Sequence, residues 1–323
     1  MASPSTHTKS LCPYCFRSIP AQRISTDEAT YLSKSCPEHG DLGKTLIWKN
    51  HSRAYSDWIR SPENVSGHPA ENVQAAENKA PTSGNCPYEC GLCADHRQAT
   101  CSAILEVTRH CDMDCRICFA SADSDTVEHP ELSQIEEMFL AVRDSAGFPP
   151  IQLSGGEPTS RNDLPRIISL ARKIGFDHIQ VNTNGVRLAE DADFANALKD
   201  AGVSDFFLQF DGTTDEVYAH IRRKNLLSTK LKALERCAEL EIGTILVPTV
   251  VKNINDHQIG TIIGLAKEWI PTVRGVHFQP ITFLGRYPSA PHNEDRVLIP
   301  DILDAIEAQT GGELKVDHFI PPG

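Results

Sequence analysis

The sequence predicts an α/β protein with a parallel sheet, preceded by a small metal-binding lobe. Two observations predict this fold. From residue 103 onward, short β-rich runs alternate with helical periods, and such alternation favours parallel strands joined by helices. Before residue 60, cysteines lie on tight turns that contain Pro or Gly, which is typical of metal-stapled lobes. The alternation by itself fits either an open doubly wound sheet or a barrel.

Composition and charge limit the classes of protein to which this chain can belong. The chain has 323 residues, which suits one domain of about 240 residues and a smaller attachment. Hydrophobic residues make up 40% of the chain, and no apolar run approaches the roughly 18 residues that span a bilayer. A net charge of −12 argues against nonspecific binding to nucleic acid. The first residues lack the basic start and apolar core of a signal peptide, so we expect a cytoplasmic protein whose eleven cysteines are mostly metal ligands.

We expect residues 1–60 to form the small lobe. Cys12 and Cys15 form one thiol pair, and Cys36 and His39 form a second pair after a segment with strand-like pieces. Two such pairs give a tetrahedral Cys3His site, which suits zinc, although thiolates equally hold a single iron. The alternatives for Cys12 and Cys15 are a metal-free structural role and a redox pair. We expect one mononuclear Zn or Fe in this lobe.

Residues 61–84 are rich in Pro, Asn, Glu and small residues without a hydrophobic period, so they are predicted to be a linker. The following segment, 85–102, contains four thiols, those of Cys86, Cys90, Cys93 and Cys101. Four thiolates would saturate an auxiliary [4Fe–4S] cluster and suit it to electron relay or structure. A structural zinc site, His96 as fourth ligand, and a three-ligand cluster that binds a substrate are the alternatives.

A third group of cysteines follows the first predicted strand of the sheet domain. Cys111, Cys115 and Cys118 have the spacing C-x3-C-x2-C. Because a [4Fe–4S] cluster normally takes four thiolates, three compact cysteines indicate a cluster with one open iron, where a cofactor or substrate can bind. A zinc knuckle or a disulfide cluster is the alternative.

The sheet domain is expected over 103–323. Its predicted strands are 103–108, 151–154, 178–182, 205–210, 244–250 and 275–280. Between the first two, a helix is predicted from Leu132 to Ser145, with Ser133 and Glu136 as its capping box. Parallel strands carry their ligands at their carboxyl ends, so the chemistry is expected there.

Polar or glycine-containing turns follow three of these strands. They supply the candidate cofactor-binding residues, which are Gly155, Gly156, Glu157, Asn182, Asn184, Gln209 and Asp211. Adjacent glycines allow a backbone to approach a ligand closely, and the Glu offers a carboxylate to an ammonium group. Ordinary turn chemistry is the alternative for each turn. Cys237 continues the apolar stripe of a helix and is expected to be a buried hydrophobe.

The three-cysteine loop followed by the Gly155–Gly156–Glu157 turn resembles the radical S-adenosylmethionine (radical SAM) superfamily. A narrower resemblance, to the tetraether lipid synthase group, rests on segments 9–13, 36–40, 86–93, 180–185 and 279–280. It covers the N-terminal and barrel portions of that group, whose members continue beyond the position of Gly323. The resemblance implies a partial, TIM-like (β/α)6 barrel, a SAM-binding [4Fe–4S] cluster, an auxiliary [4Fe–4S] cluster and a mononuclear metal. In that family the Gly-Gly-Glu turn binds the methionyl amine of SAM, and later strand ends contact its ribose and carboxylate.

The resemblance implies reductive cleavage of SAM to a 5′-deoxyadenosyl radical that removes hydrogen from an unactivated carbon. The first hypothesis for the substrate is a lipid chain, with carbon–carbon coupling, for which contact with the membrane surface is a further expectation. The second hypothesis is methylation or rearrangement of a small metabolite or peptide. The third is a non-catalytic iron–sulfur electron-transfer protein. Either enzyme would need a low-potential electron donor of the ferredoxin or flavodoxin type. The sequence indicates no general acid or base.

Overall fold

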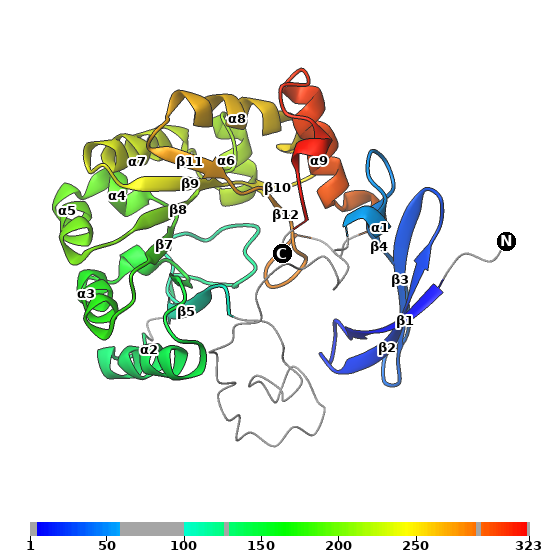
Figure 1. Cartoon of the computed structure of the whole chain (residues 1–323), viewed down its shortest axis with the longest axis horizontal. Helices are drawn as coiled ribbons and strands as arrows, with labels where there is room; N and C mark the ends of the chain where they lie inside the picture. The colour runs from blue at the N-terminus through cyan, green and yellow to red at the C-terminus, as the bar shows by residue number, and fades with distance from the viewer. Residues whose placement is uncertain (1–4, 59–99, 126–128, 289–291, 322–323) are drawn as a thin grey trace. The chain divides into compact units, whose positions relative to one another are not determined.

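The computed structural model describes residues 5–58, 100–125, 129–288 and 292–321 (Figure 1). The chain divides into two compact units, Thr100–Pro291 on the one hand and Met1–Ala99 with His292–Gly323 on the other. The predicted linker 61–84 lies outside the described residues, as do Cys86, Cys90 and Cys93. Among the helices of the described ranges, none is both long enough and apolar enough to cross a membrane.

The larger unit is built on a six-stranded parallel sheet with the order β11-β9-β8-β7-β6-β5. The strands are β5 (Ala103–Thr108), β6 (Ile151–Gly155), β7 (Ile179–Thr183), β8 (Asp205–Gln209), β9 (Gly243–Val247) and β11 (Val273–Val276). A short parallel pair, β10 (Thr249–Val250) and β12 (Gln279–Pro280), follows β9 and β11. Each predicted strand therefore has an observed counterpart, and the last two predicted runs divide into a sheet strand and a member of this pair.

Helices lie on the outer side of the arc that these strands form (Figure 1). They are α2 (Leu132–Ala146), α3 (Leu164–Ile174), α4 (Val186–Glu190), α5 (Ala192–Ala201), α7 (Leu227–Glu239) and α8 (Ile259–Glu268). The helix α6 (Asp215–Arg222) instead packs against the loop of residues 111–118 through Tyr218 and Ile221. Short 3₁₀ turns at Pro158–Ser160 and Asp256–Gln258 complete the unit. The predicted α/β fold with a parallel sheet is confirmed as a partial barrel.

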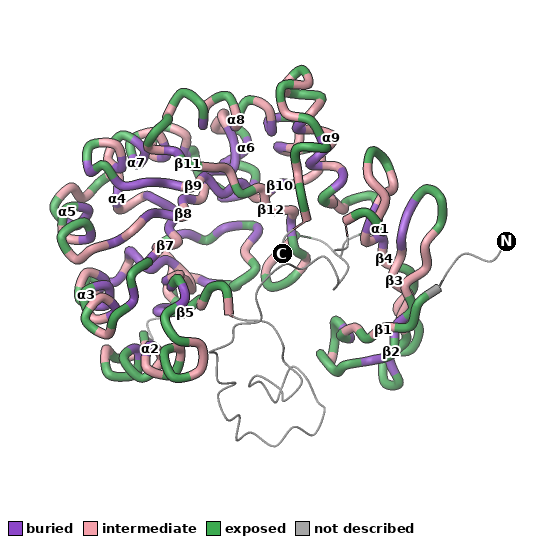
Figure 2. Tube along the Cα trace, viewed as in Figure 1, coloured by how far each residue is buried: buried purple, intermediate pink, exposed green. Residues whose placement is uncertain are grey.

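Alternate strand residues form the core between sheet and helices. Leu105, Leu153 and Val181 belong to one buried cluster with Ile135 of α2 and Leu198 of α5. Figure 2 shows buried stretches along the strands of the larger unit. Because successive side chains of a strand point to opposite faces, the residues between them face the inner, concave side of the sheet. Cys237 on α7 is fully buried in the same core, as the sequence predicted.

The start of α2 differs from the prediction. The N-cap is Glu131, whose backbone N–H donates to Gln134 Oε1 at 2.8 Å, so the capping pair predicted at Ser133 and Glu136 was wrong by two residues. Leu132 packs against the core, which favours an earlier helix start.

The smaller unit contains a four-stranded antiparallel sheet, β1 (Ser5–Leu11), β2 (Ser18–Ser25), β3 (Ala29–Cys36) and β4 (Gly40–Lys49), in that order. The helix α1 (Tyr55–Trp58) follows it. The chain returns to this unit with α9 (Ile299–Gln309), flanked by 3₁₀ turns at Asn293–Asp295 and Val316–His318. Lys49 pairs with Asp301 at 2.7 Å, and the backbone N–H of Leu46 donates to Asn293 Oδ1 at 2.9 Å. These contacts group residues 292–321 with the lobe, whereas the sequence analysis assigned them to the sheet domain.

Candidate functional site

The loop with Cys111, Cys115 and Cys118 lies directly after β5, at the carboxyl end of the sheet. Arg286 holds it from one side, because Cys118 and Arg286 exchange two backbone hydrogen bonds of 2.9 and 2.8 Å. The guanidinium of Arg286 also donates from Nε to Cys115 O at 2.6 Å. The irregular loop is therefore held by hydrogen bonds that Arg286 forms with its backbone.

The three thiols of this loop share one apolar surrounding. Cys115 is buried in a cluster with Met113 and Tyr218, and Cys111 and Cys118 pack against that cluster. Burial raises the pKa of the Cys111 thiol to about 12, and it also raises the pKa of Cys115, where Arg222 opposes the effect. Iron binding would therefore have to displace protons from these thiols.

The spacing of donor atoms distinguishes this loop from the lobe. Within the described ranges, one group of Cys and His ligand atoms lies close enough together to hold a single metal ion, and it consists of Cys12, Cys15, Cys36 and His39. The described cysteines of the 111–118 loop do not form such a group. The thiols of Cys111, Cys115 and Cys118 are thus not placed to share one ion, and a cluster, in which each thiolate holds its own iron, does not require that they do.

The turn after β6 lies against this loop. Gly155 has a φ of +124°, and a Cβ there would lie 2.0 Å from Thr108 O. A Cβ on Gly156 would lie 2.1 Å from His110 O. The N–H groups of Gly156 and Glu157 donate to these same two carbonyls, both at 2.8 Å. Glycine is thus required here because two backbone segments meet, whereas the sequence analysis had explained the glycines by approach of a ligand.

A cavity of about 330 Å³ opens beside this turn. Its walls include Glu106 and Thr108 of β5, Gly155 and Gly156, and residues 120–122, which directly follow the third cysteine. A ligand in this cavity would therefore contact both the glycine turn and the end of the cysteine loop.

Glu157 is buried and its carboxylate is surrounded by donors from its own chain. Oε1 accepts from Thr159 N at 3.0 Å, from Thr159 Oγ1 at 2.7 Å and from Thr183 Oγ1 at 2.7 Å. Oε2 accepts from Asn184 N at 2.6 Å. Burial raises the pKa of Glu157 while these hydrogen bonds lower it, and the net direction is upward. In this structure the carboxylate joins the ends of β6 and β7.

Asn182, near the end of β7, and Asn184, just after it, have different positions. Asn184 is buried, and its Nδ2 donates to Asp112 Oδ1 of the cysteine loop at 2.7 Å. Asn182 lies on the concave face and donates from Nδ2 to Ser154 Oγ at 3.1 Å. Its Oδ1 is buried without a hydrogen-bond partner among the described residues. Asn184 therefore orients the loop, and Asn182 presents an unsatisfied acceptor.

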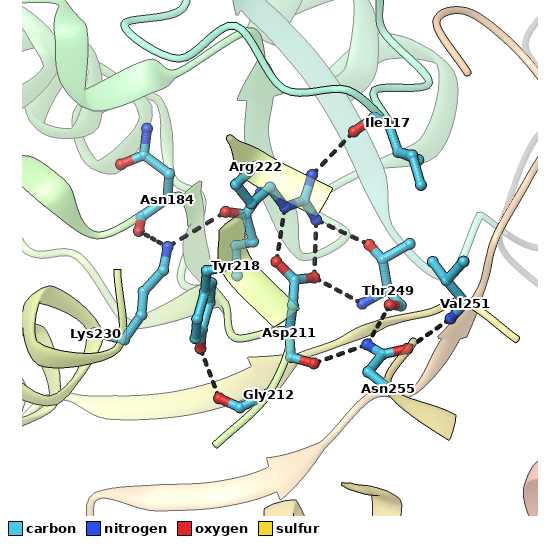
Figure 3. A network of polar contacts seen from close by, with 11 residues as sticks. Ile117, Asn184, Asp211, Gly212, Tyr218, Arg222, Lys230, Thr249, Val251 and Asn255 are labelled. Carbon is cyan, nitrogen blue, oxygen red and sulfur yellow. Dashed lines mark hydrogen bonds and ion pairs between the residues drawn. The ribbon is translucent and has the colours of Figure 1, made fainter. Parts of the chain in front are cut away.

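Asp211 and Arg222 form a buried ion pair beneath the cysteine loop (Figure 3). Asp211 Oδ2 accepts from Arg222 Nε at 2.7 Å, and Oδ1 accepts from Nη2 at 2.8 Å. Arg222 also donates from Nη1 to Ile117 O at 3.0 Å. Asp211 has no exposed surface, so it supports the loop through Arg222.

Lys230 of α7 adds a second buried cation to this network (Figure 3). Its ammonium donates to Asn184 O and, at 3.3 Å, to Gln209 Oε1. Burial lowers the pKa of Lys230 to about 8. Gln209, predicted to bind a cofactor, is partly exposed on the concave face and is oriented by this lysine.

The N-terminal lobe contains a compact metal site. The ligand atoms of Cys12, Cys15, Cys36 and His39 all lie within 4.8 Å of one another. His39 Nδ1 is 3.4 Å from Cys36 Sγ and 3.6 Å from Cys12 Sγ. Burial opposes ionisation of Cys36, but hydrogen bonds from His39 and nearby backbone N–H groups lower its pKa to about 6. Three thiols and an imidazole at these separations fit a tetrahedral ion.

The other predicted metal ligands are not brought together by the described structure. Cys101 is exposed just before β5, while Cys86, Cys90 and Cys93 lie outside the described residues. The sequence analysis also missed four residues that shape the site, namely Glu106, Arg222, Lys230 and Arg286. Of these, Glu106 gave a signal, because it interrupts an apolar strand between Leu105 and Val107.

Family models match both units. The Radical SAM superfamily model matches residues 105–266, and the model of the HMPTM N-terminal zinc ribbon domain matches residues 4–49. The first match covers most of β5, the strands β6 to β10, the cysteine loop and the buried Asp211–Arg222 pair with Lys230. The second covers the four ligands of the lobe.

This chain spans part of the length of the curated relatives that it matches. A 7,8-dihydro-6-hydroxymethylpterin dimethyltransferase of Methanocaldococcus jannaschii is 39% identical over 317 residues, which are 97% of this chain and 60% of the relative. A GTP 3′,8-cyclase of Syntrophomonas wolfei is 30% identical over 181 residues, 55% of each chain. The chain thus spans about three fifths of the first relative's length.

A solved structure shares the fold of the larger unit. The structure of anSMEcpe with bound AdoMet aligns with a TM-score of 0.50 and 17% sequence identity, over 66% of this chain and 62% of that chain. At this identity the likeness concerns the fold alone.

Proposed function

Because the chain belongs to the radical SAM superfamily, whose model spans half of it, we propose that it is a radical SAM enzyme that methylates a small heterocyclic metabolite of the pterin class. The observation that carries this proposal is the 39% identity with a dihydropterin dimethyltransferase over 97% of the chain. That match includes the zinc ribbon as well as the barrel, whereas the cyclase match covers 55% of the chain.

The side chains on the concave face of the sheet favour a polar substrate. Strand pairing places Glu106 opposite Ser154 and Gln152 opposite Gln180 on this face. An enclosed apolar groove would favour a lipid chain, but all four of these side chains are polar and at least partly exposed, and Gln152, Gln180 and Ser154 form side-chain hydrogen bonds. The comparisons and this surface therefore favour the small-metabolite hypothesis over the tetraether-type lipid coupling that the sequence resemblance suggested.

The family implies a [4Fe–4S] cluster and SAM. We assign the cluster to Cys111, Cys115 and Cys118, and SAM to the cavity beside Gly155 and Gly156. When bound, the cluster and SAM together supply the electron and the carbon radical that removes hydrogen from a substrate. The chain's own part is to hold the loop rigid through Arg222 and Arg286 and to position the ligand next to it.

This assignment changes the role expected for Glu157. The sequence analysis gave its carboxylate to the ammonium group of SAM, but four donors from Thr159, Thr183 and Asn184 already surround it. Glu157 is therefore proposed to act indirectly, by keeping two strand ends in register. Asp211 and Asn184 are likewise proposed to support the loop, whereas Asn182 and Gln209 remain candidates for ligand contact.

The lobe is proposed to hold zinc, as the name of its matching family model suggests. An auxiliary [4Fe–4S] cluster on Cys86, Cys90, Cys93 and Cys101 also remains a proposal, and so does a ferredoxin- or flavodoxin-like electron donor. Two clusters would give about eight sulfides per chain, and one cluster about four. Anaerobic sulfide analysis separates these cases, and about four sulfides would remove the auxiliary cluster.

Analysis of cell extracts tests the proposed substrate. Cells that express the chain are compared with cells that express the Cys115→Ala variant, and both pterins and lipids are analysed by mass spectrometry. The proposal predicts pterins with added methyl groups only in cells with the intact cysteine loop. Unchanged pterins together with coupled or altered lipids would instead support the lipid hypothesis.

A further inference from the structure

Three side chains on the concave face form a directed chain of hydrogen bonds. Asp205 on β8 accepts from Gln180 Nε2 on β7, and Gln180 Oε1 accepts from Gln152 Nε2 on β6 at 2.6 Å. His178 Nε2 lies 3.0 Å from the other carboxylate oxygen of Asp205. Strand register places these residues in one row, since Gln152 is opposite Gln180, and Gln180 is opposite Asp205.

The chemistry of Asp205 fixes the direction of this chain. An ionised carboxylate only accepts hydrogen bonds, so Gln180 must turn its NH2 group toward Asp205. Its carbonyl oxygen then faces Gln152, which must in turn donate its NH2 group. The carbonyl oxygen of Gln152 is left as an acceptor at the end of the chain, beside β5.

Two further acceptors lie near that point. Glu106 on β5 is an exposed residue on the same face, two residues further along the strand than Ile104, which pairs with Gln152. Its carboxylate has no hydrogen-bond or ion-pair partner among the residues that the structure describes. Asn182 adds a buried Oδ1 that also lacks a partner within those residues. The face thus offers several acceptors, and the cavity that Glu106 borders is also lined by the donors Arg109 and Ser121.

We propose that Glu106, Gln152 and Asn182 form a substrate subsite for the donor edge of a 2-amino-4-oxo heterocycle. This proposal rests on the proposed function and names the part of the molecule that recognises the substrate. A ring N–H and an adjacent exocyclic amino group donate in parallel to one carboxylate, as a guanidinium does. The carbonyl oxygens of Gln152 and Asn182 accept further N–H groups, and Ile104, 64% exposed, offers an apolar surface to the ring.

The position of Glu106 also relates the subsite to the cavity. Glu106 lines the cavity that contains Gly155 and Gly156, so a heterocycle bound to it lies next to a ligand of the cysteine loop. The same position raises the competing assignment that Glu106 binds the ammonium group of SAM. Separate measurement of the two affinities distinguishes these assignments.

The test uses the full chain, reconstituted anaerobically with iron and sulfide and saturated with SAM. Titration calorimetry measures binding of 7,8-dihydro-6-hydroxymethylpterin and of its analogue with oxygen in place of the 2-amino group. We expect the wild type to prefer the amino compound by about tenfold or more, because the analogue keeps the ring N–H but places its 2-oxo group, an acceptor, against the second carboxylate oxygen of Glu106. Glu106→Gln should weaken pterin binding by about tenfold and abolish that preference, with SAM affinity unchanged. Glu137→Gln, an exposed change on α2, is the matched control.

Each other outcome counts against the subsite. Unchanged pterin binding by Glu106→Gln overturns it and leaves the proposed function standing. A parallel loss of SAM affinity assigns Glu106 to the SAM site and likewise overturns it. Failure of the wild type to bind the pterin, with SAM bound normally, overturns the proposed function and the subsite together.

Discussion

Asp211 and Arg222 join the end of β8 to the end of α6 through two hydrogen bonds of 2.7 and 2.8 Å, in a position closed to solvent. Arg222 extends this pair to the cysteine loop through Ile117 O. A buried ion pair costs desolvation energy and often adds little net stability, but removal of one partner leaves the other charge unpaired. The pair therefore orders the loop more than it stabilises the fold.

We expect Asp211→Leu to lower the free energy of unfolding by about 3–5 kcal/mol, because the guanidinium of Arg222 would remain buried without a counter-charge. Denaturant unfolding measures this loss, with the exposed Glu216→Gln as control. The double variant Asp211→Leu/Arg222→Met should recover most of the stability. A single variant as stable as the wild type would show that the pair is not buried as described.

The buried Lys230 makes the stability of the fold depend on pH, and the direction of its pKa shift gives the sign of that dependence. Burial lowers its pKa from 10.5 to about 8, so between these values the unfolded chain binds a proton that the folded chain lacks. Stability should therefore rise as pH increases from about 8 toward 10.5, by roughly 3 kcal/mol in total. Unfolding free energies of wild type and Lys230→Met are compared at several pH values, because the variant removes this contribution. A difference that stays constant with pH contradicts the assignment.

The Glu157→Ala variant tests whether the Glu157 carboxylate supports the strand ends or contacts SAM directly. If the carboxylate joins β6 to β7, its removal leaves several buried donors unsatisfied and should cost at least about 2 kcal/mol in the absence of SAM. Unfolding of the cluster-free protein measures that cost. A variant with unchanged stability but weakened SAM binding would restore the direct contact that the sequence analysis expected.

The lobe should depend on its metal. Chelation or Cys12→Ser should remove about one zinc per chain and make the 5–58 segment sensitive to protease, because metal binding and folding are coupled in small metal sites. Metal analysis measures the loss of zinc, and limited proteolysis measures the sensitivity to protease. Cys237→Ala removes a buried thiol outside the site and should leave zinc content unchanged. Zinc retained by the Cys12 variant would place the ion elsewhere.

The sequence predicted the strands, the lobe ligands and the cysteine loop because each has a local pattern. Alternation of strand and helix defined β5 to β11, and tight cysteine turns defined the site at Cys12 and His39. Local pattern did not reveal what Glu157 and Asp211 contact, since their partners are 26 or 27 positions away at Thr183 and Asn184, and 11 positions away at Arg222. Residues 292–321 were assigned to the sheet domain because nothing in their sequence records the ion pair of Asp301 with Lys49.

Cleavage of SAM is the most direct measurement of the central assignment. The anaerobically reconstituted chain is incubated with SAM and a low-potential reductant, and 5′-deoxyadenosine is quantified for the wild type and for Cys111→Ala, Cys115→Ala and Cys118→Ala. We predict 5′-deoxyadenosine from the wild type and none above background from any of the three variants. Absence of 5′-deoxyadenosine from a wild type with full cluster content, or equal formation by the variants, would contradict a SAM-binding cluster on this loop.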